Sequence, residues 1–303
     1  MRRGAAARAV FALALAAACA RERPPSAAPP AAPRLGVLSP SAAETLVALG
    51  AGASIVAVGD WVRRPPELAA TPGLGSFEAP SAERVLELGV DTLITVRSLA
   101  GRRELEELER LGVRVVELDT STFAGTLDSI AALGALVGRE DAAAALAASI
   151  RARLDAVAAR ARGAAPRRVL VVVGREPLFV AGPGSHLDEL VRLAGGVNVL
   201  ADLAAPYAEV SLEAVLARGP EIVLDVAEVG AGASRGEPPG EWGRWPRLPA
   251  VAAGRVYRVD PSRLSVPGPR LPEMAELVAR LVQPERFGAP LESDFAALDG
   301  AAR

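Results

Sequence analysis

One stretch occurs twice in this chain, first as Ser81-Ala82-Glu83-Arg84-Val85-Leu86-Glu87-Leu88-Gly89-Val90-Asp91 and again as Ser211-Leu212-Glu213-Ala214-Val215-Leu216-Ala217-Arg218-Gly219-Pro220-Glu221. Serine, glutamate, valine, leucine, glycine and a closing acid recur at a constant offset of 130 residues. Each copy predicts a short helix with a serine N-cap, an acid in its first turn and a glycine at its C-terminal end. An apolar strand follows each helix, at 92–96 and at 222–226. Because two copies are too few for a solenoid, the repetition indicates two similar lobes, each carrying one glutamate at an equivalent place.

A second pair of segments supports this duplication. Residues 44–52 resemble residues 188–196 at an offset of 144, so the first lobe holds 14 more residues between its two matched segments. The surplus includes a proline-rich loop from Trp61 to Phe77. Extra loop in one copy is where binding specificity is usually found, so we expect this loop to contribute to a site.

Strands and helices alternate along both halves of the chain. In the first half, strands are expected at 35–38, 55–58, 92–96 and 113–118, with helices at 42–49, 81–88 and 102–111. Residues 123–162 contain no proline and carry apolar residues at helical spacing, which predicts one long helix, or two if Gly138 breaks it. A second half then runs from a strand at 169–173 to a helix at 269–282. This pattern predicts an α/β fold of two similar Rossmann-like lobes with mostly parallel sheets, joined by one long backbone helix.

The expected division of the chain follows from these elements and from its ends. We expect a signal peptide at 1–18, a lipidated cysteine and spacer at 19–33, an N-terminal lobe at 34–120, a connecting helix at 121–164, a C-terminal lobe at 165–283 and a tail at 284–303. The chain from Gln283 onward is expected to be poorly ordered, at least in part.

The N-terminus has the pattern of a secretory signal. Arginines precede a short apolar run, residues 9–18, which ends at Cys19 and is too short to span a bilayer. Residues 15–19 resemble a bacterial lipobox in which Cys19 is lipidated, although Ala16 stands where that pattern prefers leucine. The alternative is an ordinary signal peptide cut near Ala18, with Cys19 incidental. Residues 20–33 are rich in proline and alanine and predict an extended spacer of roughly 40 Å.

Composition removes most enzyme classes. All 34 basic residues are arginine, which excludes a P-loop lysine and a Schiff-base lysine. The single histidine excludes a His-Glu-x-x-His zinc site, and the lone cysteine is assigned to the N-terminal signal. The formal net charge of −2 does not favour nucleic acid, whose binders are basic. We therefore expect no enzyme activity, no resident cofactor, no metal site and no nucleic-acid partner.

Several further motifs accompany the repeats in a fixed order. They are Leu38-Ser39-Pro40-Ser41-Ala42-Ala43-Glu44, Asp60 with Pro65-Pro66, Gly182–Ser185 with Ala194–Asn198, and Trp245–Val251 with Gly254–Tyr257. Together they resemble the helical-backbone (class III) substrate-binding proteins that serve ABC importers of vitamin B12, haem and ferric siderophores. The resemblance covers nearly all of residues 34–283, and it is strongest to the branch of this family that binds vitamin B12.

The resemblance implies a receptor with a ligand cleft between its lobes. It would be an extracytoplasmic, membrane-anchored lipoprotein, held through acylated Cys19, that delivers a cobalt corrinoid or an iron chelate to a permease dimer with its ATPase. In this family one glutamate on each lobe docks onto arginines of the permease, and Glu83 and Glu213 match those positions. The alternative for each glutamate is a favourable acid at a helix N-terminus, worth about 0.3–1 kcal/mol.

The same resemblance assigns candidate ligand-binding residues. Phe179 and Tyr207 match aromatic cleft positions of the second lobe. Trp61 and Phe77 lie in the enlarged loop of the first lobe, where we expect them to contact the ligand. Arg97 follows a strand end, where ligands of α/β sheets tend to bind. The alternative for each aromatic residue is packing in a lobe, which is the reading we take for Trp242 and Trp245.

Two departures from the family pattern leave the ligand open. The vitamin B12 branch offers an aspartate and an arginine in the loop before the last helix; this chain keeps neither at its aligned place, and Arg263 would substitute. Haem-binding relatives supply tyrosine or histidine to the iron, and here Tyr207 and His186 are the candidates for an axial contact, with a structural role as the alternative for His186.

Two further classes of function stay open. One is a haem or ferric-siderophore receptor of the same fold. The other is an enzyme or a non-transport binding module on a two-lobe α/β scaffold. Residues 50–52 do not support a dinucleotide site, because this Gly-Ala-Gly follows a helix and precedes a strand, the reverse of what phosphate binding requires.

Overall fold

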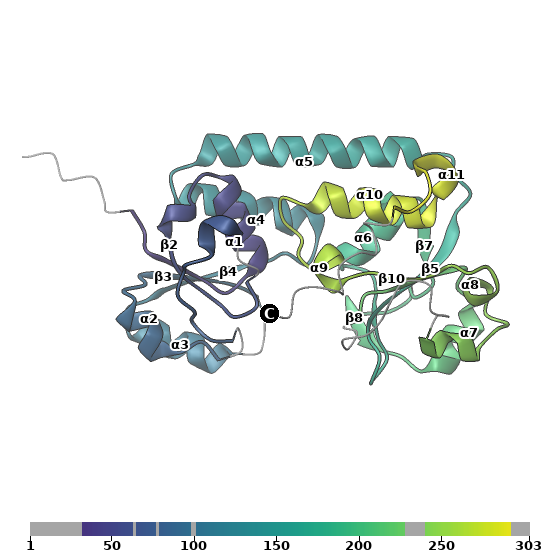
Figure 1. Cartoon of the computed structure of the whole chain (residues 1–303), viewed down its shortest axis with the longest axis horizontal. Helices are drawn as coiled ribbons and strands as arrows, with labels where there is room; N and C mark the ends of the chain where they lie inside the picture. The colour runs from purple at the N-terminus through teal and green to yellow at the C-terminus, as the bar shows by residue number, and fades with distance from the viewer. Residues whose placement is uncertain (1–31, 63–64, 77–78, 98–100, 228–239, 292–303) are drawn as a thin grey trace, which may run out of the picture. The chain divides into compact units, whose positions relative to one another are not determined.

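The structure is a computed structural model that describes residues 32–62, 65–76, 79–97, 101–227 and 240–291 (Figure 1). Residues Pro33–Arg303 form one compact unit, which contains the hydrophobic core. The expected signal peptide, Cys19 and nearly all of the spacer lie outside the described residues. Within the described ranges, no helix combines the length and the apolar character that a membrane crossing requires.

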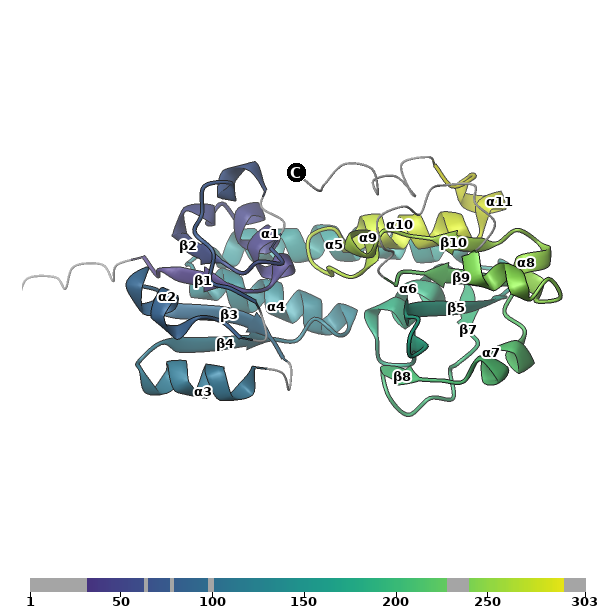
Figure 2. The same cartoon turned by 60° about the horizontal axis from the view of Figure 1, so that its bottom comes forward.

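The first lobe is built on a four-stranded sheet. Its strands are β1 (Leu35–Val37), β2 (Ile55–Val58), β3 (Thr92–Val96) and β4 (Arg114–Leu118), all parallel in the order β2-β1-β3-β4. Helices α2 (Ala82–Glu87) and α3 (Arg102–Arg110) lie on one face of this sheet (Figure 2). They pack on it through Val85, Leu105 and Leu108. Helix α1 (Pro40–Ala48) packs on the other face through Ala42 and Leu46. Apolar residues on both faces of the strands are what a sheet covered on both sides requires.

The second lobe repeats this sheet and adds to it. Strands β5 (Arg167–Gly174), β7 (Gly196–Asn198), β9 (Ile222–Asp225) and β10 (Val256–Arg258) pair in parallel, and their order β7-β5-β9-β10 matches that of the first sheet. Strands β6 (Phe179–Ala181) and β8 (Tyr207–Glu209) extend the sheet in antiparallel fashion beside the last residues of β5. The helices of this lobe are α6 (His186–Leu193), α7 (Leu212–Arg218), α8 (Pro249–Ala252) and α9 (Pro261–Leu264). The predicted duplication is therefore a structural one.

Both copies of the repeated stretch have the predicted caps. Ser81 Oγ accepts from the Arg84 amide, and Ser211 Oγ accepts from the Ala214 amide, each at 3.2 Å. Gly89 and Gly219 have positive φ angles of 61° and 54°, which favour glycine after a helix. The serines and glycines were thus read correctly as helix limits.

An arginine at the start of each sheet explains why an acid closes each copy. The Arg34 amide donates to Asp91 Oδ2 at 3.0 Å, and Arg34 Nε donates to the Gly89 carbonyl at 2.8 Å. In the second lobe the Arg168 amide donates to Glu221 Oε2 at 2.9 Å, and Arg168 Nε donates to the carbonyl of the matching glycine at 3.1 Å. These equivalent bonds fix helices α2 and α7 in the same relation to their sheets.

Two helices connect the lobes. They are α4 (Phe123–Leu136) and α5 (Glu140–Ala161), and they are separated at Gly138, whose φ is +65°. The break foreseen at this glycine is present, so the predicted helix over 123–162 is two helices. Helix α5 alone has 22 residues, or about 33 Å. It runs beside α10 (Leu271–Val282) (Figure 1). Arg153 on α5 forms ion pairs with Glu273 and Glu276 on α10.

The chain after α10 packs back on the second lobe. Gln283 is fully buried, and its amide nitrogen donates to the Ala165 carbonyl at 3.0 Å. Helix α11 (Pro284–Phe287) follows, and the Phe287 ring contacts the Arg160 guanidinium. Residues 283–287 therefore pack on the second lobe. A tail that is poorly ordered in part stays a prediction, and residues 292–303 lie outside the described residues.

The two tryptophans assigned to packing lie where that reading placed them. Trp242 is 5% exposed in the core of the second lobe, and its ring meets Trp245 edge to face at 6.1 Å between centroids. Trp242 lies in the middle of a 3₁₀ turn (Gly240–Arg244), and Trp245 directly follows that turn. The other 3₁₀ turns in the described residues are Gly52–Ser54 and Pro66–Leu68.

Candidate functional site

An open pocket lies at the carboxyl ends of the first sheet. Its volume is about 210 Å³, and its lining residues are Leu38, Ser39, Pro40, Ser41, Trp61, Val96, Thr120, Ser265, Val266 and Pro267. Most of these residues follow strands β1 to β4, and the last three come from the segment between α9 and α10. The carboxyl ends of parallel strands are the usual ligand side of α/β sheets, so the location agrees with a binding role.

Trp61 is the aromatic side of this pocket. It follows β2 and is 59% exposed, which is unusual for so large an apolar side chain. An exposed indole beside a pocket offers a flat surface for stacking at little entropic cost. Its expected partner in the same loop, Phe77, lies outside the described residues.

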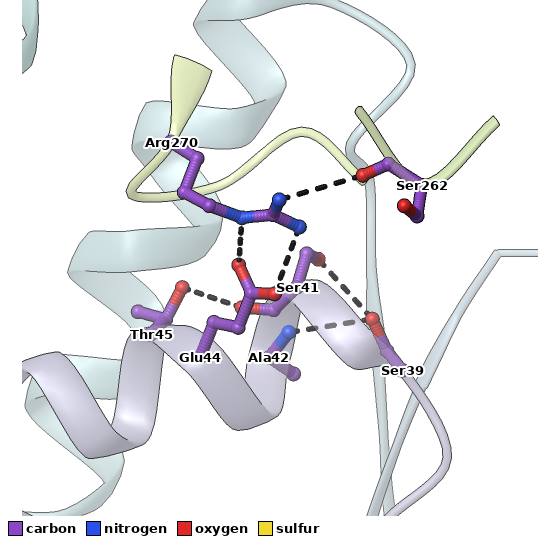
Figure 3. A network of polar contacts seen from close by, with 7 residues as sticks. All are labelled: Ser39, Ser41, Ala42, Glu44, Thr45, Ser262 and Arg270. Atoms are coloured by element: carbon purple, nitrogen blue, oxygen red, sulfur yellow. Dashed lines mark hydrogen bonds and ion pairs between the residues drawn. The ribbon is translucent and has the colours of Figure 1, made fainter. Parts of the chain in front are cut away.

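The floor of the pocket is fixed by the start of helix α1. Ser39 caps this helix by accepting from the Ala42 amide at 3.4 Å, and its hydroxyl lies 3.2 Å from that of Ser41 (Figure 3). Thr45 Oγ1 donates to the Ser41 carbonyl at 2.7 Å. Both serines are buried and line the pocket, so their hydroxyls are held in place before a ligand arrives.

One ion pair joins the floor of the pocket to the last long helix. Arg270, the N-cap residue of α10, donates from Nε and Nη2 to the two carboxylate oxygens of Glu44 at 2.8 and 2.9 Å (Figure 3). Its Nη1 also donates to the Ser262 carbonyl at 3.4 Å. Since Glu44 lies on α1, this bidentate pair connects α1 with the segment that supplies Ser265 to Pro267 to the pocket.

Arg97 lies at the same edge of the first sheet. It follows β3, and its Nη1 forms an ion pair with Asp119, which follows β4, at 3.3 Å. Hydrogen bonds from the Ser121 hydroxyl and amide lower the pKa of Asp119, and Arg97 lowers it further. The side chain of Arg97 is 68% exposed, so it is free to reorient toward a ligand.

The two second-lobe aromatics share one face of the added ladder. Phe179 on β6 pairs with Glu209, and Ala181 pairs with Tyr207 on β8, so Phe179 and Tyr207 are diagonal neighbours on one face. They are 38% and 37% exposed. Removal from water raises the pKa of the Tyr207 phenol to about 12, so this side chain is neutral at physiological pH. The pair forms a second aromatic surface, on the other lobe from Trp61.

Two further candidates lie near the segment that completes the pocket. Arg263 is half-buried on α9, directly before that segment. His186 is 6% exposed, and its Nε2 lies 2.8 Å from the Leu264 carbonyl oxygen. Burial lowers the pKa of His186, so the neutral ring donates this bond and ties α6 to α9. That arrangement gives His186 the structural role named as its alternative, and metal ligation by it stays a prediction.

The two candidate docking glutamates occupy equivalent surface positions. Glu83 and Glu213 are both exposed in the first turns of α2 and α7, one residue after the first residue of each helix. The pKa of Glu213 is lowered by bonds from its own backbone amide and from the Ser211 hydroxyl. Both glutamates therefore lie exposed on matched surfaces of the two lobes.

Sequence reasoning missed most of the pocket lining. Ser39, Ser41 and Thr120 carried no ligand signal, because serine and threonine at these places also serve as helix caps and loop residues. The segment 265–267 was recognised only through the neighbouring Arg263. Among the described residues, no cluster of three histidine, cysteine, aspartate or glutamate side chains is arranged to hold a metal ion.

Comparisons with known proteins agree with this geometry. A sequence model of the family described as periplasmic binding protein matches residues 36–262. The vitamin B12-binding protein of Salmonella typhimurium is 32% identical over 200 residues, which cover 66% of this chain and 74% of that protein.

Solved structures give the same picture. The periplasmic vitamin B12 binding protein of Vibrio cholerae superposes with a TM-score of 0.72 at 27% identity, over 83% of this chain and 97% of that one. A periplasmic heme binding protein of Pseudomonas aeruginosa superposes with a TM-score of 0.71 at 27% identity, over 86% of this chain and 95% of that one. The relatives are named as binding proteins, and their fold has the two lobes described above.

Proposed function

This chain belongs to the periplasmic binding protein family, and from that premise we propose that it is the receptor of an ABC importer for a corrinoid. The family is extracytoplasmic, and its members bind small ligands. The finer proposal is that the ligand is similar to vitamin B12 and that the receptor delivers it to a permease dimer driven by an ATPase. The observation that carries the proposal is the pocket under Trp61 at the carboxyl ends of the first sheet.

The pocket would hold only part of such a ligand. Its volume of about 210 Å³ is below the roughly 300–1,000 Å³ of sites that enclose a drug-sized molecule. A corrin ring is larger still, so we propose that one edge of the ring enters the pocket against Trp61. The rest of the macrocycle would lie against the aromatic surface of Phe179 and Tyr207, with Phe77, Arg97 and Arg263 contacting its periphery.

The names of two relatives favour a corrinoid among the possible chelates. The Salmonella typhimurium and Vibrio cholerae proteins are both described as binding vitamin B12. Haem is the second candidate, because the Pseudomonas aeruginosa structure is described as a heme binding protein and superposes almost as well. In that case Tyr207 would be the first residue to test as an iron ligand.

Equilibrium dialysis of the compact unit, residues 33–303, against cyanocobalamin, haem and a ferric siderophore tests the proposal. We expect retention of cyanocobalamin at one molecule per chain. Retention of haem alone, or of the siderophore alone, would replace the corrinoid by that ligand. Retention of none of the three would contradict a metal-chelate receptor.

Delivery requires docking and a position at the membrane. We propose that Glu83 and Glu213 pair with basic sites on a two-fold permease, one from each lobe. We also propose that residues 1–18 are removed and that acylated Cys19 anchors the receptor through the spacer. Mass spectrometry of the mature chain tests the anchor: a lipid-modified Cys19 supports it, and an unmodified N-terminus at or after Cys19 contradicts it.

A further inference from the structure

Two arginines flank a buried aspartate at the carboxyl edge of the second sheet. Asp225, the last residue of β9, is fully buried and lies in register with Arg258 on β10. Arg175, which follows β5, donates from Nε and Nη2 to Asp225 Oδ2 at 3.1 and 2.8 Å. Trp242 Nε1 donates to the same oxygen at 3.2 Å, and the Ala227 amide donates to Oδ1 at 3.3 Å. The carboxylate is therefore satisfied by its own lobe and holds the Arg175 guanidinium in place.

One N–H group of Arg258 has no comparable acceptor in the part of the chain that the structure describes. Its Nε is buried and has no hydrogen-bond partner among the residues that the structure describes. Residues in register on adjacent parallel strands point to the same face, so Arg258 shares the face of Asp225 and Trp242. Buried N–H groups are nearly always paired in native proteins, and an unpaired one needs an explanation. An acceptor atom on a bound ligand would pair with this N–H group.

The duplication places these arginines on the ligand side of the lobe. Val37 pairs with Ile94 in the first sheet, and Val171 pairs with Leu224 in the second, so the two pairs are equivalent. Counting on from them, residues 39–41, which form the pocket floor, correspond to residues 173–175. Arg175 thus occupies the place in the second lobe that Ser41 occupies in the first, and it begins the turn that leads to Phe179.

We propose that Arg175 and Arg258 form a subsite for an acidic group of the ligand, a carboxylate or a phosphate ester. Arg175 is paired with the Asp225 carboxylate and Arg258 lies in register with it, so these three residues together carry one net positive charge. Arg175 uses two of its five N–H groups on Asp225 and its side chain is 23% exposed, so the remaining donors are held ready at the surface. An arginine fixed in advance loses little entropy when it binds an oxyanion.

This subsite rests on the proposed function in one respect only, that the acidic group belongs to a metal chelate. It makes the proposed function more specific, because it names the group of the ligand that the second lobe binds. The Arg97–Asp119 pair at the carboxyl edge of the first sheet is far more exposed, so the arginine there is less constrained. We therefore expect the second lobe to bind the acidic group of the ligand, while the pocket beside Trp61 binds the neutral edge of the ring.

Small oxyanions test the subsite without knowledge of the ligand. The arginine Nε–H resonances of the compact unit are followed by NMR during titration with acetate and with inorganic phosphate, against chloride at equal ionic strength. We expect saturable shifts of Arg175 and Arg258, and at least about 10-fold weaker binding in Arg258→Met, since a hydrogen bond to a charged group is lost. Preference for acetate or for phosphate tells a carboxylate from a phosphate ester. Absence of a saturable shift, or equal binding in Arg258→Met, overturns the proposal.

A matched variant and a stability measurement separate binding from folding. Arg255→Met changes an arginine just before the same strand, at the opposite end from the subsite, and should leave anion binding unchanged. Arg258→Met should melt no lower than the wild type, because it removes an unpaired buried N–H. A lower melting temperature without weaker anion binding would assign Arg258 a structural role and overturn the proposal. Arg258→Lys, which keeps the charge but lacks the Nε–H, serves if the methionine variant does not fold.

Chelates with and without an acid complete the test. Arg258→Met should lower the affinity for cyanocobalamin, which carries a phosphodiester, or for haem, which carries carboxylates, by about 10- to 100-fold. The substitution should leave the affinity for a corrinoid without the phosphodiester unchanged. An equal loss of affinity for both kinds of corrinoid would overturn the proposed subsite. If the wild type takes up phosphate or acetate but none of the chelates, the proposed function fails while the subsite stands.

Discussion

The ion pair between Glu44 and Arg270 should couple the two lobes energetically. Its two N–H···O bonds of 2.8 and 2.9 Å are bidentate, and the side chains are 22% and 41% exposed. The gross attraction of two charges about 4 Å apart is roughly 1 kcal/mol in water and about 4 kcal/mol at the effective dielectric of a protein surface. Desolvation and side-chain entropy offset most of it, and the exposure of Arg270 adds screening, so we expect a net coupling of about 1 kcal/mol.

A double-mutant cycle measures this coupling. Free energies of unfolding in urea are compared for the wild type, Glu44→Gln, Arg270→Gln and the double variant. The Arg97–Asp119 pair is the matched control, because its partners are 68% and 42% exposed at 3.3 Å, and its coupling should stay below about 0.5 kcal/mol. A Glu44–Arg270 coupling no larger than that of the control would refute the reasoning that this pair ties α1 to the start of α10.

Three other predictions concern the site and the docking surface. Trp61→Ala should lower the affinity for a macrocyclic ligand by about 5- to 10-fold, because a stacking surface is lost. It should change the free energy of unfolding by less than about 0.5 kcal/mol, since the indole is 59% exposed. Calorimetry measures the affinity, and urea unfolding measures the stability. Glu83→Ala and Glu213→Ala should each lower affinity for the permease about 10-fold without changing ligand affinity in pull-down and dialysis assays, while Glu87→Ala, on the same helix as Glu83 but paired with Arg84, should change neither. Burial raises the pKa of Tyr207 to about 12, so between pH 10 and 12 the unfolded chain loses this proton before the folded one does. The free energy of unfolding should therefore fall as pH rises through that window, and less so in Tyr207→Phe; an equal fall in both would count against the shift.

Much of the fold follows from sequence because its determinants are local. The serine caps and the positive-φ glycines act within one helix turn, and the alternation of apolar strands with helices predicts parallel sheets. The repetition added long-range information, since equal segments imply equal surroundings. The equivalent bonds of Arg34 and Arg168 to the closing acids show that this inference was sound.

The parts that sequence reasoning missed depend on contacts between distant segments. Strands β6 and β8 have only three residues each and pair with each other across a segment that contains α6. Strands this short show no periodic pattern of apolar residues from which they could be predicted. The polar side chain of Gln283 is buried because its amide nitrogen donates hydrogen bonds to the Ala165 and Gly195 carbonyl oxygens, which belong to distant segments of the chain.

The charged clusters were equally hidden. Arginine supplies every basic residue of the chain, so a single arginine carries little information, and Arg175 and Arg258 became distinctive only through the register of β5, β9 and β10. The pocket lining was found at Trp61, whose size and surroundings are unusual, but not at the serines, which are common in caps.

The most direct test of the central claim is isothermal titration calorimetry of the compact unit with cyanocobalamin, in the wild type and in Trp61→Ala. A corrinoid receptor built as described should give saturable one-to-one binding in the sub-micromolar range, weakened about 5- to 10-fold by the substitution. Absence of heat with cyanocobalamin would contradict the corrinoid assignment. Tight binding that Trp61→Ala leaves unchanged would show that the ligand does not use the pocket at the carboxyl ends of the first sheet.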